Sequence, residues 1–201
     1  MVAATSHPSR ESLFMQDLLP TRATYADILS APPHLIAEII GGRLVTHPRP
    51  APKHVVGTSR LGLVIGHAYD WKISKRSDGW WILDEPEIHL GDAVVAPDLA
   101  GWRHERMPGV PATAWFDLAP DWICEVISPS TARYNKSEKR DLYAAHGVKH
   151  LWHIDPAPRL LEVFELSDGK WVLVKTYRDD DSVTAPPFGD SPFALELLWA
   201  D

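Results

Sequence analysis

The sequence predicts an α/β protein in which helices flank a mixed β-sheet. Three observations predict this class: a glycine pair between two apolar runs, a long amphipathic segment over 53–73, and an apolar strand over 121–127 that is followed by a capped helix and more strands. Helices interspersed with strands in this way are typical of α/β folds. We find no repeat and no interdomain linker, so we expect a loose leader over 1–20 and a single domain over 21–201.

The first third of the domain is predicted to hold a short helix over 24–29, a β-hairpin and a long helix. The hairpin strands are 35–40 and 43–46, and the two residues between them are Gly41 and Gly42. Glycine permits the positive φ angles that a two-residue hairpin turn requires. After a proline-rich connection, apolar residues recur with helical spacing over 53–73, which predicts an amphipathic helix.

Further strands are predicted over 80–83, 87–90 and 94–102, the last interrupted by Pro97 and Asp98. A proline within an apolar run indicates a strand edge, a bulge or the start of a new strand. The doubly apolar strand over 121–127 comes next. Its residues alternate between two largely apolar faces, so we expect it to be buried on both sides.

A helix over 136–146 is predicted after this strand. Asn135 is a favourable N-cap, Glu138 completes an approximate capping box, and Gly147 suits a left-handed C-terminal cap. Three strands follow, over 148–154, 160–166 and 171–177, with turn residues between them.

Three acidic residues, Glu38, Asp98 and Glu125, interrupt apolar runs that resemble strands. Glu125 is the most informative, because an unpaired carboxylate in a doubly buried strand needs a partner, a proton or a metal ion. A single strand acid most often faces solvent at an edge. Three such acids indicate a shared site, because gathered carboxylates repel one another unless a cation neutralises them. Mg²⁺, which prefers oxygen ligands, is the natural candidate.

Lys139 lies in the first half of the predicted helix, on the same face as Leu142, Tyr143 and His146. Two interpretations are open from the residues. The side chain can extend along the apolar stripe with its ammonium group in water. Alternatively, the ammonium group reaches the carboxylates, where it could stabilise a phosphate or orient an attacking water.

An ordered series of motifs accompanies these residues over roughly 24–180. It consists of Glu38-Ile39-Ile40-Gly41-Gly42-Arg43-Leu44, Pro48-Arg49-Pro50, His54, Ala96-Pro97-Asp98-Leu99, Glu125-Val126-Ile127-Ser128-Pro129-Ser130-Thr131, Glu138-Lys139-Arg140, Tyr143, Gly147-Val148, Trp152 and Asp155-Pro156. This series resembles the PD-(D/E)XK nuclease superfamily, and specifically its Uma-two family. The resemblance implies a restriction-endonuclease-like core.

The resemblance also implies the roles of individual residues. Asp98 would match the motif aspartate, Glu125 the motif acid and Glu38 an additional upstream acid. All three would be catalytic and would hold Mg²⁺, with Mn²⁺ as a substitute. The usual motif lysine position is occupied by Ile127, so the lysine would have migrated to Lys139 on the next helix. The family often has an aspartate where this chain has Asn135.

The activity that the resemblance implies is metal-dependent endonucleolytic hydrolysis of nucleic-acid phosphodiester bonds, with DNA as the expected partner. Two basic groups could contact backbone phosphates despite a net charge of −7. One is the pair Arg49 and Lys53. The other is the segment with Arg133, Lys136, Lys139 and Arg140, for which a solvated helix face is an equally good explanation. Many nucleases of the superfamily are dimers, so we consider a homodimer.

The composition is typical of soluble globular proteins, and the single cysteine fits a reducing compartment. We therefore expect a cytoplasmic protein. Cys124 itself is expected in the core. No apolar run approaches the roughly 20 residues that span a membrane, and there is no signal-peptide segment.

Two alternatives to the nuclease remain. The first is a non-catalytic module that keeps the nuclease fold and binds nucleic acid or protein. The second is a zinc hydrolase, which the ten histidines invite. However, His150 and His153 would point to opposite faces of a strand, and zinc-ligand motifs are absent. His54 could contact phosphate or cap the long helix. Trp102, Trp122 and Trp152 are expected in the core.

Overall fold

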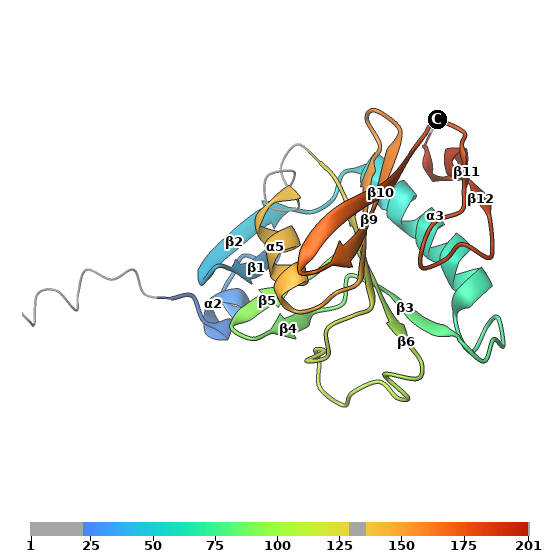
Figure 1. The fold of residues 1–201 in the computed structure, drawn as a ribbon. Coiled ribbons are helices and arrows are strands. Elements are labelled where there is room, and N and C mark those ends of the chain that lie inside the picture. The colour runs from blue at the N-terminus through green and yellow to red at the C-terminus, as the bar shows by residue number, and fades with distance from the viewer. Residues whose placement is uncertain (1–21, 129–135, 201) are drawn as a thin grey trace, which may run out of the picture.

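The computed structural model describes residues 22–128 and 136–200, and these form one mixed α/β structure (Figure 1). In chain order its elements are α2 (Tyr25–Leu29), β1 (Leu35–Ile40), β2 (Arg43–Pro48), α3 (Pro52–Tyr69), β3 (Trp80–Asp84), β4 (Ile88–Leu90), β5 (Ala93–Val95), β6 (Leu99–Arg103), β7 (Trp122–Val126), α5 (Glu138–Ala145), β8 (His150–Asp155), β9 (Leu160–Ser167), β10 (Lys170–Arg178), β11 (Ser182–Val183), β12 (Phe193–Ala194) and the 3₁₀ helix η1 (Leu195–Leu198).

The strands form two main sheets and one short ribbon. A four-stranded sheet has the order β2-β1-β5-β4, a six-stranded sheet has the order β10-β9-β8-β7-β6-β3, and β11 pairs with β12. Among the described residues of the larger sheet, β7 and β8 form the one parallel pair of strands, and α5 lies between them in the chain. The α/β class with a mixed sheet is therefore confirmed, although the predicted strands are divided between two sheets.

The predicted β-hairpin forms the outer half of the smaller sheet. Ile40 pairs with Arg43, and the two glycines between them have φ angles of +58° and +74°. A residue with a side chain adopts such angles only with strain, so the glycine pair fixes both the turn and the strand register. The register places Glu38 in the middle of β1, opposite Val45.

The predicted interruption at Pro97 and Asp98 marks the point where the chain passes from one sheet to the other. β5, before it, belongs to the smaller sheet, and β6, after it, belongs to the larger one. Of the three alternatives that a proline in a strand indicates, the start of a new strand is the observed one. Asp98 consequently lies at the junction of the two sheets.

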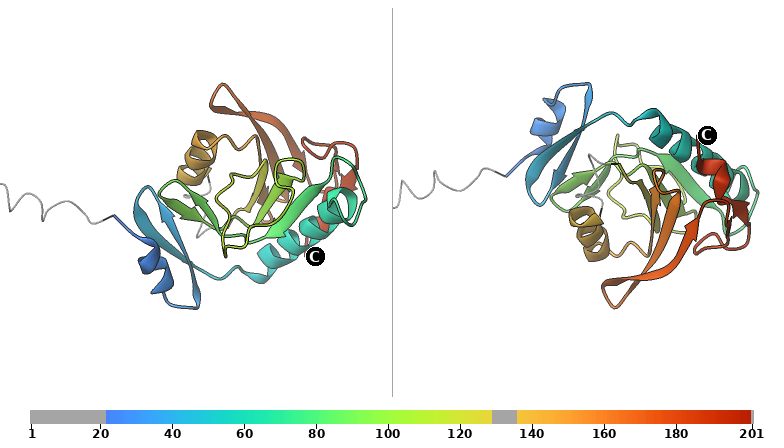
Figure 2. Two further views of the ribbon diagram at one scale, coloured as in Figure 1. Left: turned by 90° about the horizontal axis from the view of Figure 1, so that it is seen from below. Right: turned by 90° about the horizontal axis from the view of Figure 1, so that it is seen from above.

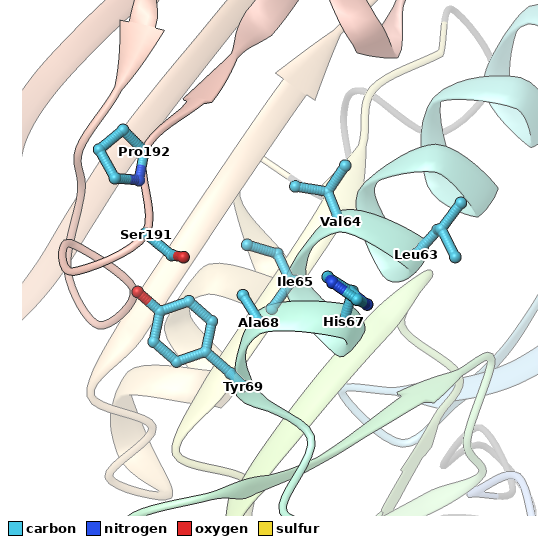
Figure 3. Close-up of a pocket in the computed structure, with 8 residues that line it drawn as sticks. All are labelled: Leu63, Val64, Ile65, His67, Ala68, Tyr69, Ser191 and Pro192. Atoms are coloured by element: carbon cyan, nitrogen blue, oxygen red, sulfur yellow. The ribbon is translucent and has the colours of Figure 1, made fainter. Parts of the chain in front are cut away.

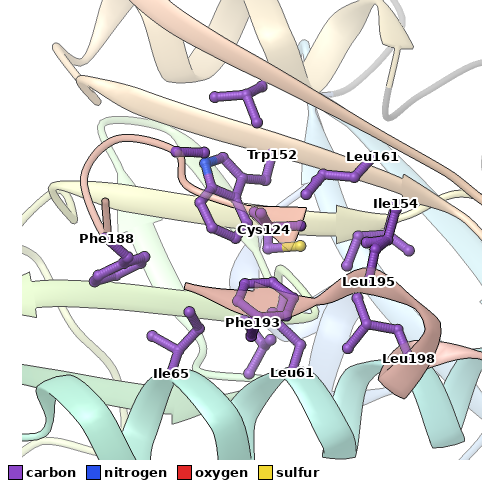
Figure 4. Packing of buried hydrophobic residues seen from close by; sticks show 14 of the residues in the cluster. Leu61, Ile65, Cys124, Trp152, Ile154, Leu161, Phe188, Phe193, Leu195 and Leu198 are labelled. Carbon is purple, nitrogen blue, oxygen red and sulfur yellow. The ribbon is translucent and has the colours of Figure 1, made fainter. Parts of the chain in front are cut away.

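β7 is completely buried, and its two faces contact different cores. Trp122, Cys124 and Val126 belong to the core beneath α3, which also contains Leu61 and Ile65 of that helix (Figure 4). Ile123 belongs to a second core on the side of α5, together with Tyr143. The two helices cover opposite sides of the larger sheet (Figure 2).

The predicted burial of this strand on both faces is confirmed. The predicted core position is also confirmed for Trp102, Trp122, Trp152 and Cys124.

The helix after β7 is shorter than predicted. α5 begins at Glu138 with Ser137 as its N-cap, whereas the predicted N-cap, Asn135, lies outside the described residues, as do the leader over 1–20 and Arg133. The predicted end is confirmed, because Gly147 has a φ of +73° and the Val148 N–H donates to the Tyr143 carbonyl. The sequence prediction also missed β11, β12 and η1, whose runs are too short to show a period.

Within the described ranges no helix is long and apolar enough to cross a membrane.

Candidate active site

Three of the four predicted site residues are in direct contact. Lys139 of α5 lies between Glu38 of β1 and Glu125 of β7, with Nζ at 3.1 Å from Glu38 Oε1 and 2.7 Å from Glu125 Oε1. The side chains are only 2–3% exposed. The interpretation of Lys139 as a side chain with its ammonium group in water is therefore wrong, and the interpretation that it reaches the carboxylates is confirmed.

Asp98, the fourth residue, is brought next to Glu125 by the strand register. Leu99 pairs with Cys124 in an antiparallel ladder, so the residue before Leu99 lies opposite the residue after Cys124. Both carboxylate oxygens of Asp98 have a partner. Oδ2 accepts a hydrogen bond from the Val126 N–H at 2.6 Å, and Oδ1 is 2.6 Å from Nε2 of His54 in the first turn of α3. Asp98 is thus held in one orientation by two neighbouring elements.

Glu38 is held by three groups. Its Oε1 accepts a hydrogen bond from the Ala96 N–H at 2.8 Å in addition to its contact with Lys139, and its Oε2 is 3.3 Å from His47 Nε2. Burial by itself raises the pKa of Glu38, but Lys139, His47 and the Ala96 N–H more than offset that effect and lower the pKa to about 2. Glu38 is therefore a carboxylate at neutral pH. The hydrogen bond to Glu38 in turn raises the pKa of His47.

Glu125 is less well compensated than Glu38. Its Oε1 accepts a hydrogen bond from the Tyr143 hydroxyl at 2.6 Å and also contacts Lys139. Burial raises the pKa of Glu125 to about 7; Lys139 opposes this shift, and the charges of Asp98 and Glu38 add to it. Lys139 shows the opposite balance, because burial lowers its pKa but Glu125 and Glu38 raise it above the ordinary lysine value. Lys139 is therefore a buried ammonium ion.

Asp98, Glu125 and Lys139 line a cavity of about 460 Å³. The other polar residues of its wall are His47, Arg49, His54, Glu85, Glu87 and Ser128, and the apolar residues are Leu35, Ile36, Ala37, Pro48, Pro50, Ala51 and Ala96. Glu38 is not among the lining residues. The cavity is therefore lined both by the charged catalytic candidates and by apolar residues from β1, the end of β2 and the segment that follows it.

A second hollow, of about 430 Å³, lies along α3 between Leu63, Tyr69 and the segment with Ser191 and Pro192 (Figure 3). Its lining contains one histidine, His67, but no carboxylate and no lysine. It therefore has none of the acid-and-lysine chemistry of the first cavity.

The cavity is a suitable place for a divalent cation. No group of three or more His, Cys, Asp or Glu side chains is arranged to hold a metal ion, as far as the described residues go. Mg²⁺, however, is commonly bound by one or two carboxylates, with water and substrate phosphate as the other ligands. Asp98 and Glu125 supply two carboxylates on the cavity wall. A cation bound between them would also relieve the repulsion that Asp98 exerts on Glu125, which adds to the effect of burial in raising the pKa of Glu125.

The basic residues Lys136 and Arg140 contact other groups instead. Lys136 lies 3.9 Å from Glu162, and the guanidinium group of Arg140 covers the ring of Phe164. His153 is buried with both ring nitrogens unpartnered among the described residues. Its neighbours on β8, Trp152 and Ile154, belong to the core beneath α3, so His153 faces the side of α5.

Sequence reasoning did not assign roles to His47 and Tyr143 in the site. The hydroxyl of Tyr143 could have been expected near Lys139, because the two residues are four apart on one helix face. His47 carried no such signal, because its contact with Glu38 depends on the pairing of β1 with β2. For His54, the contact with Asp98 adds a role to the two that were considered.

Comparisons with known proteins agree with this architecture. A family model described as "Uma2: Putative restriction endonuclease" matches residues 23–196. A solved structure, described as a putative nuclease belonging to DUF820 from Anabaena variabilis ATCC 29413, is similar with a TM-score of 0.68 and 23% sequence identity. The similarity covers 88% of this chain and 97% of that chain. No curated protein matches the sequence.

Proposed function

Because the chain belongs to the Uma2 (Uma-two) family of restriction-endonuclease-like proteins, we propose that it is a metal-dependent endonuclease that hydrolyses DNA phosphodiester bonds. Family membership supports a nuclease in general terms. The observation that carries the specific proposal is that Asp98 and the buried pair of Glu125 and Lys139 line one cavity. Two acids beside one ammonium group are suited to hold a divalent cation and to stabilise a phosphate that enters.

In this proposal Asp98 and Glu125 hold Mg²⁺, with Mn²⁺ as a substitute. The sequence resemblance adds Glu38 as a third ligand, acting directly or through water. A bound divalent cation lowers the pKa of a coordinated water and stabilises the negative charge that develops on the phosphate. The hydrogen bonds from His54 and the Val126 N–H keep the carboxylate of Asp98 turned towards one place. Such outer contacts commonly tune a metal site.

Lys139 supplies a fixed positive charge in the cavity. Its ammonium group is held by two carboxylates and cannot follow a substrate into solvent. It binds the scissile phosphate or orients the attacking water, and in either role it needs no rearrangement during the reaction. Removing it should leave a cavity that still attracts cations but stabilises the phosphate poorly.

The substrate strand has two kinds of surface to contact. Arg49 lines the cavity, and Lys53 is exposed in the first turn of α3, so both can neutralise neighbouring phosphates. The apolar wall with Leu35, Ile36 and Pro48 faces the same space and suits a sugar or a base.

The test is cleavage of supercoiled plasmid and of single-stranded DNA in Mg²⁺, Mn²⁺ or EDTA. Wild-type protein should cut only with metal, and Glu125→Ala and Lys139→Ala should lose cutting. Lys170→Ala, which removes an exposed lysine at the start of β10, is the matched control and should cut normally. Cutting and metal binding that survive in Glu125→Ala would reject the proposed site.

A second candidate is a non-catalytic module that binds nucleic acid or protein. The observation in its favour is that Glu85 and Glu87 add negative charge to a cavity whose acids already have Lys139 as their cation. This alternative predicts binding without turnover in any metal. Retention of labelled DNA by a well-folded protein that never cuts it would favour this candidate over the nuclease.

We also propose that the protein is a cytoplasmic homodimer. The support is the superfamily resemblance for the dimer and the lone, buried Cys124 for a reducing compartment. Light scattering of the purified chain tests the dimer, and a monomer at micromolar concentration would reject it.

A further inference from the structure

We propose that Glu38 is a positioning residue that anchors Lys139 and is not a ligand of the divalent cation. The inference rests on the proposed nuclease function, and it changes the role that the family resemblance gives to this acid. It divides the three carboxylates into two classes: Asp98 and Glu125 would face the metal ion, and Glu38 would face only the lysine.

Both oxygens of Glu38 already have partners. Oε1 receives the Ala96 N–H at 2.8 Å and the ammonium group of Lys139 at 3.1 Å, and Oε2 lies 3.3 Å from His47. A carboxylate offers about four acceptor positions in total. Both positions on Oε1 are taken, so a metal ion there would have to displace the Ala96 N–H or the lysine and leave it without its partner in a buried place. The one remaining position is on Oε2, beside His47.

Glu38 also lies apart from the cavity that the other two acids line. Asp98, Glu125 and Lys139 line the cavity, whereas Glu38 does not and is 2% exposed. His47 lies on the cavity wall and contacts Glu38 from that side. A hydrated cation with its substrate phosphate therefore reaches Asp98 and Glu125. It meets His47 and Lys139 before it meets Glu38.

The charges of the site also favour an anchor for Lys139 away from the metal ion. A divalent cation bound at Glu125 repels the ammonium group of Lys139, which touches the same carboxylate at 2.7 Å. Without a second anion, the lysine would be driven away when the metal arrives. Glu38 lies on the smaller sheet and Glu125 on the larger one, so Lys139 has an acceptor on each. The acceptor away from the metal can hold the lysine in place.

The test compares Glu38→Gln with Asp98→Asn, two isosteric changes that each remove one negative charge. Mn²⁺ affinity is measured by calorimetry. Glu38→Gln should bind Mn²⁺ within about threefold of wild type, whereas Asp98→Asn should bind about tenfold more weakly or worse. Glu38→Gln should also cut DNA slowly through a lower kcat, because its metal site is intact but its lysine is misplaced.

A second readout is independent of activity and metal. Amine-reactive labelling followed by mass spectrometry reports how accessible Lys139 is. The amine should be protected in wild type, which buries it to 2% exposure, and labelled about tenfold faster in Glu38→Gln. Asp98→Asn should leave it protected. Glu38→Asp, which keeps the charge, should restore part of the protection.

Two results would overturn the inference: Mn²⁺ affinity lost in Glu38→Gln as fully as in Asp98→Asn, or Lys139 equally protected in Glu38→Gln and wild type. Wild-type protein that binds no Mn²⁺ would overturn the proposed metal site instead. In that case the labelling result still decides whether Glu38 anchors Lys139, so the two failures are distinguishable.

Discussion

The two faces of β7 are equally buried but are stabilised in different ways. On the face towards α3, Trp122 meets Trp152 and Phe188 edge-on, at ring-centroid distances of 5.5 and 5.0 Å. On the face towards α5, Glu125 meets Lys139 and Tyr143. Both Trp122 and Glu125 are almost completely buried. One strand therefore has apolar packing on one side and paired charges on the other.

Burial alone therefore does not distinguish structural from functional positions. Apolar packing gains free energy roughly in proportion to the area removed from water. A buried ion pair gains little, because the cost of desolvation offsets the attraction between the charges. The charged face is thus poorly explained by stability, and this is the physical reason to assign it a function. The following changes probe the contrast.

Trp122→Ala should have the largest effect, because it leaves a cavity in the apolar face. We expect a loss of about 5 kcal/mol in the free energy of unfolding. Urea denaturation followed by circular dichroism measures it. A loss of only about 1 kcal/mol would mean that the core beneath α3 relaxes to fill the cavity, and that its packing is less rigid than we infer.

Lys139→Met should be the largest change on the charged face. It keeps much of the volume but leaves two buried carboxylates without their cation, which should cost about 3 kcal/mol at pH 7. Without the lysine, burial raises the carboxylate pKa values above those of the unfolded chain, so the deficit should shrink as the pH falls and the acids take up protons. Denaturation at pH 7 and pH 4 tests this, and a deficit that grows on acidification would contradict it.

His153→Leu should alter the pH dependence of stability. Burial lowers the pKa of His153 to about 3, with Arg140, Lys136 and Lys139 adding to the shift, from an ordinary value of 6.5. The unfolded chain takes up a proton below pH 6.5 and the folded chain does not, so stability is complete above pH 6.5 and falls towards pH 3. The variant should lose about 3 kcal/mol less than wild type between pH 6.5 and 3.5. Parallel curves for the two proteins would refute this.

Tyr143→Phe should have the smallest effect on stability, about 1 kcal/mol, because Glu125 Oε1 keeps its contact with Lys139. Cleavage should fall more than stability does, since the carboxylate loses one of the groups that orient it. Denaturation and plasmid cleavage on the same preparation separate the two effects. Unchanged cleavage would place the hydroxyl outside the machinery of the site.

Much of this contrast was predictable from local sequence. The alternation of residues along β7 assigns Trp122 and Glu125 to opposite faces, and a carboxylate in a buried strand demands a partner. Gly41 with Gly42, and Gly147, predicted the places where the backbone has positive φ angles. These features depend on a residue and its immediate neighbours, which is the range over which a sequence pattern is informative.

Features that depend on distant pairing were not predictable. The sequence does not reveal that β5 and β6 enter different sheets, because both runs have the same apolar character. It offered two positions for the ammonium group of Lys139, and only the docking of α5 between β1 and β7 decides between them. The contact of His47 with Glu38 likewise follows from strand register, which no local pattern specifies.

Because Lys139 links the two sheets, it also determines when the site can assemble during synthesis of the chain. Glu38 and Asp98 are made well before Lys139, and contacts between residues far apart in sequence form late in folding. A nascent chain on the ribosome therefore carries its acids without their cation. The catalytic arrangement proposed above cannot assemble until α5 has been translated and has docked, so a cell would be exposed to cutting only by molecules that have nearly completed folding.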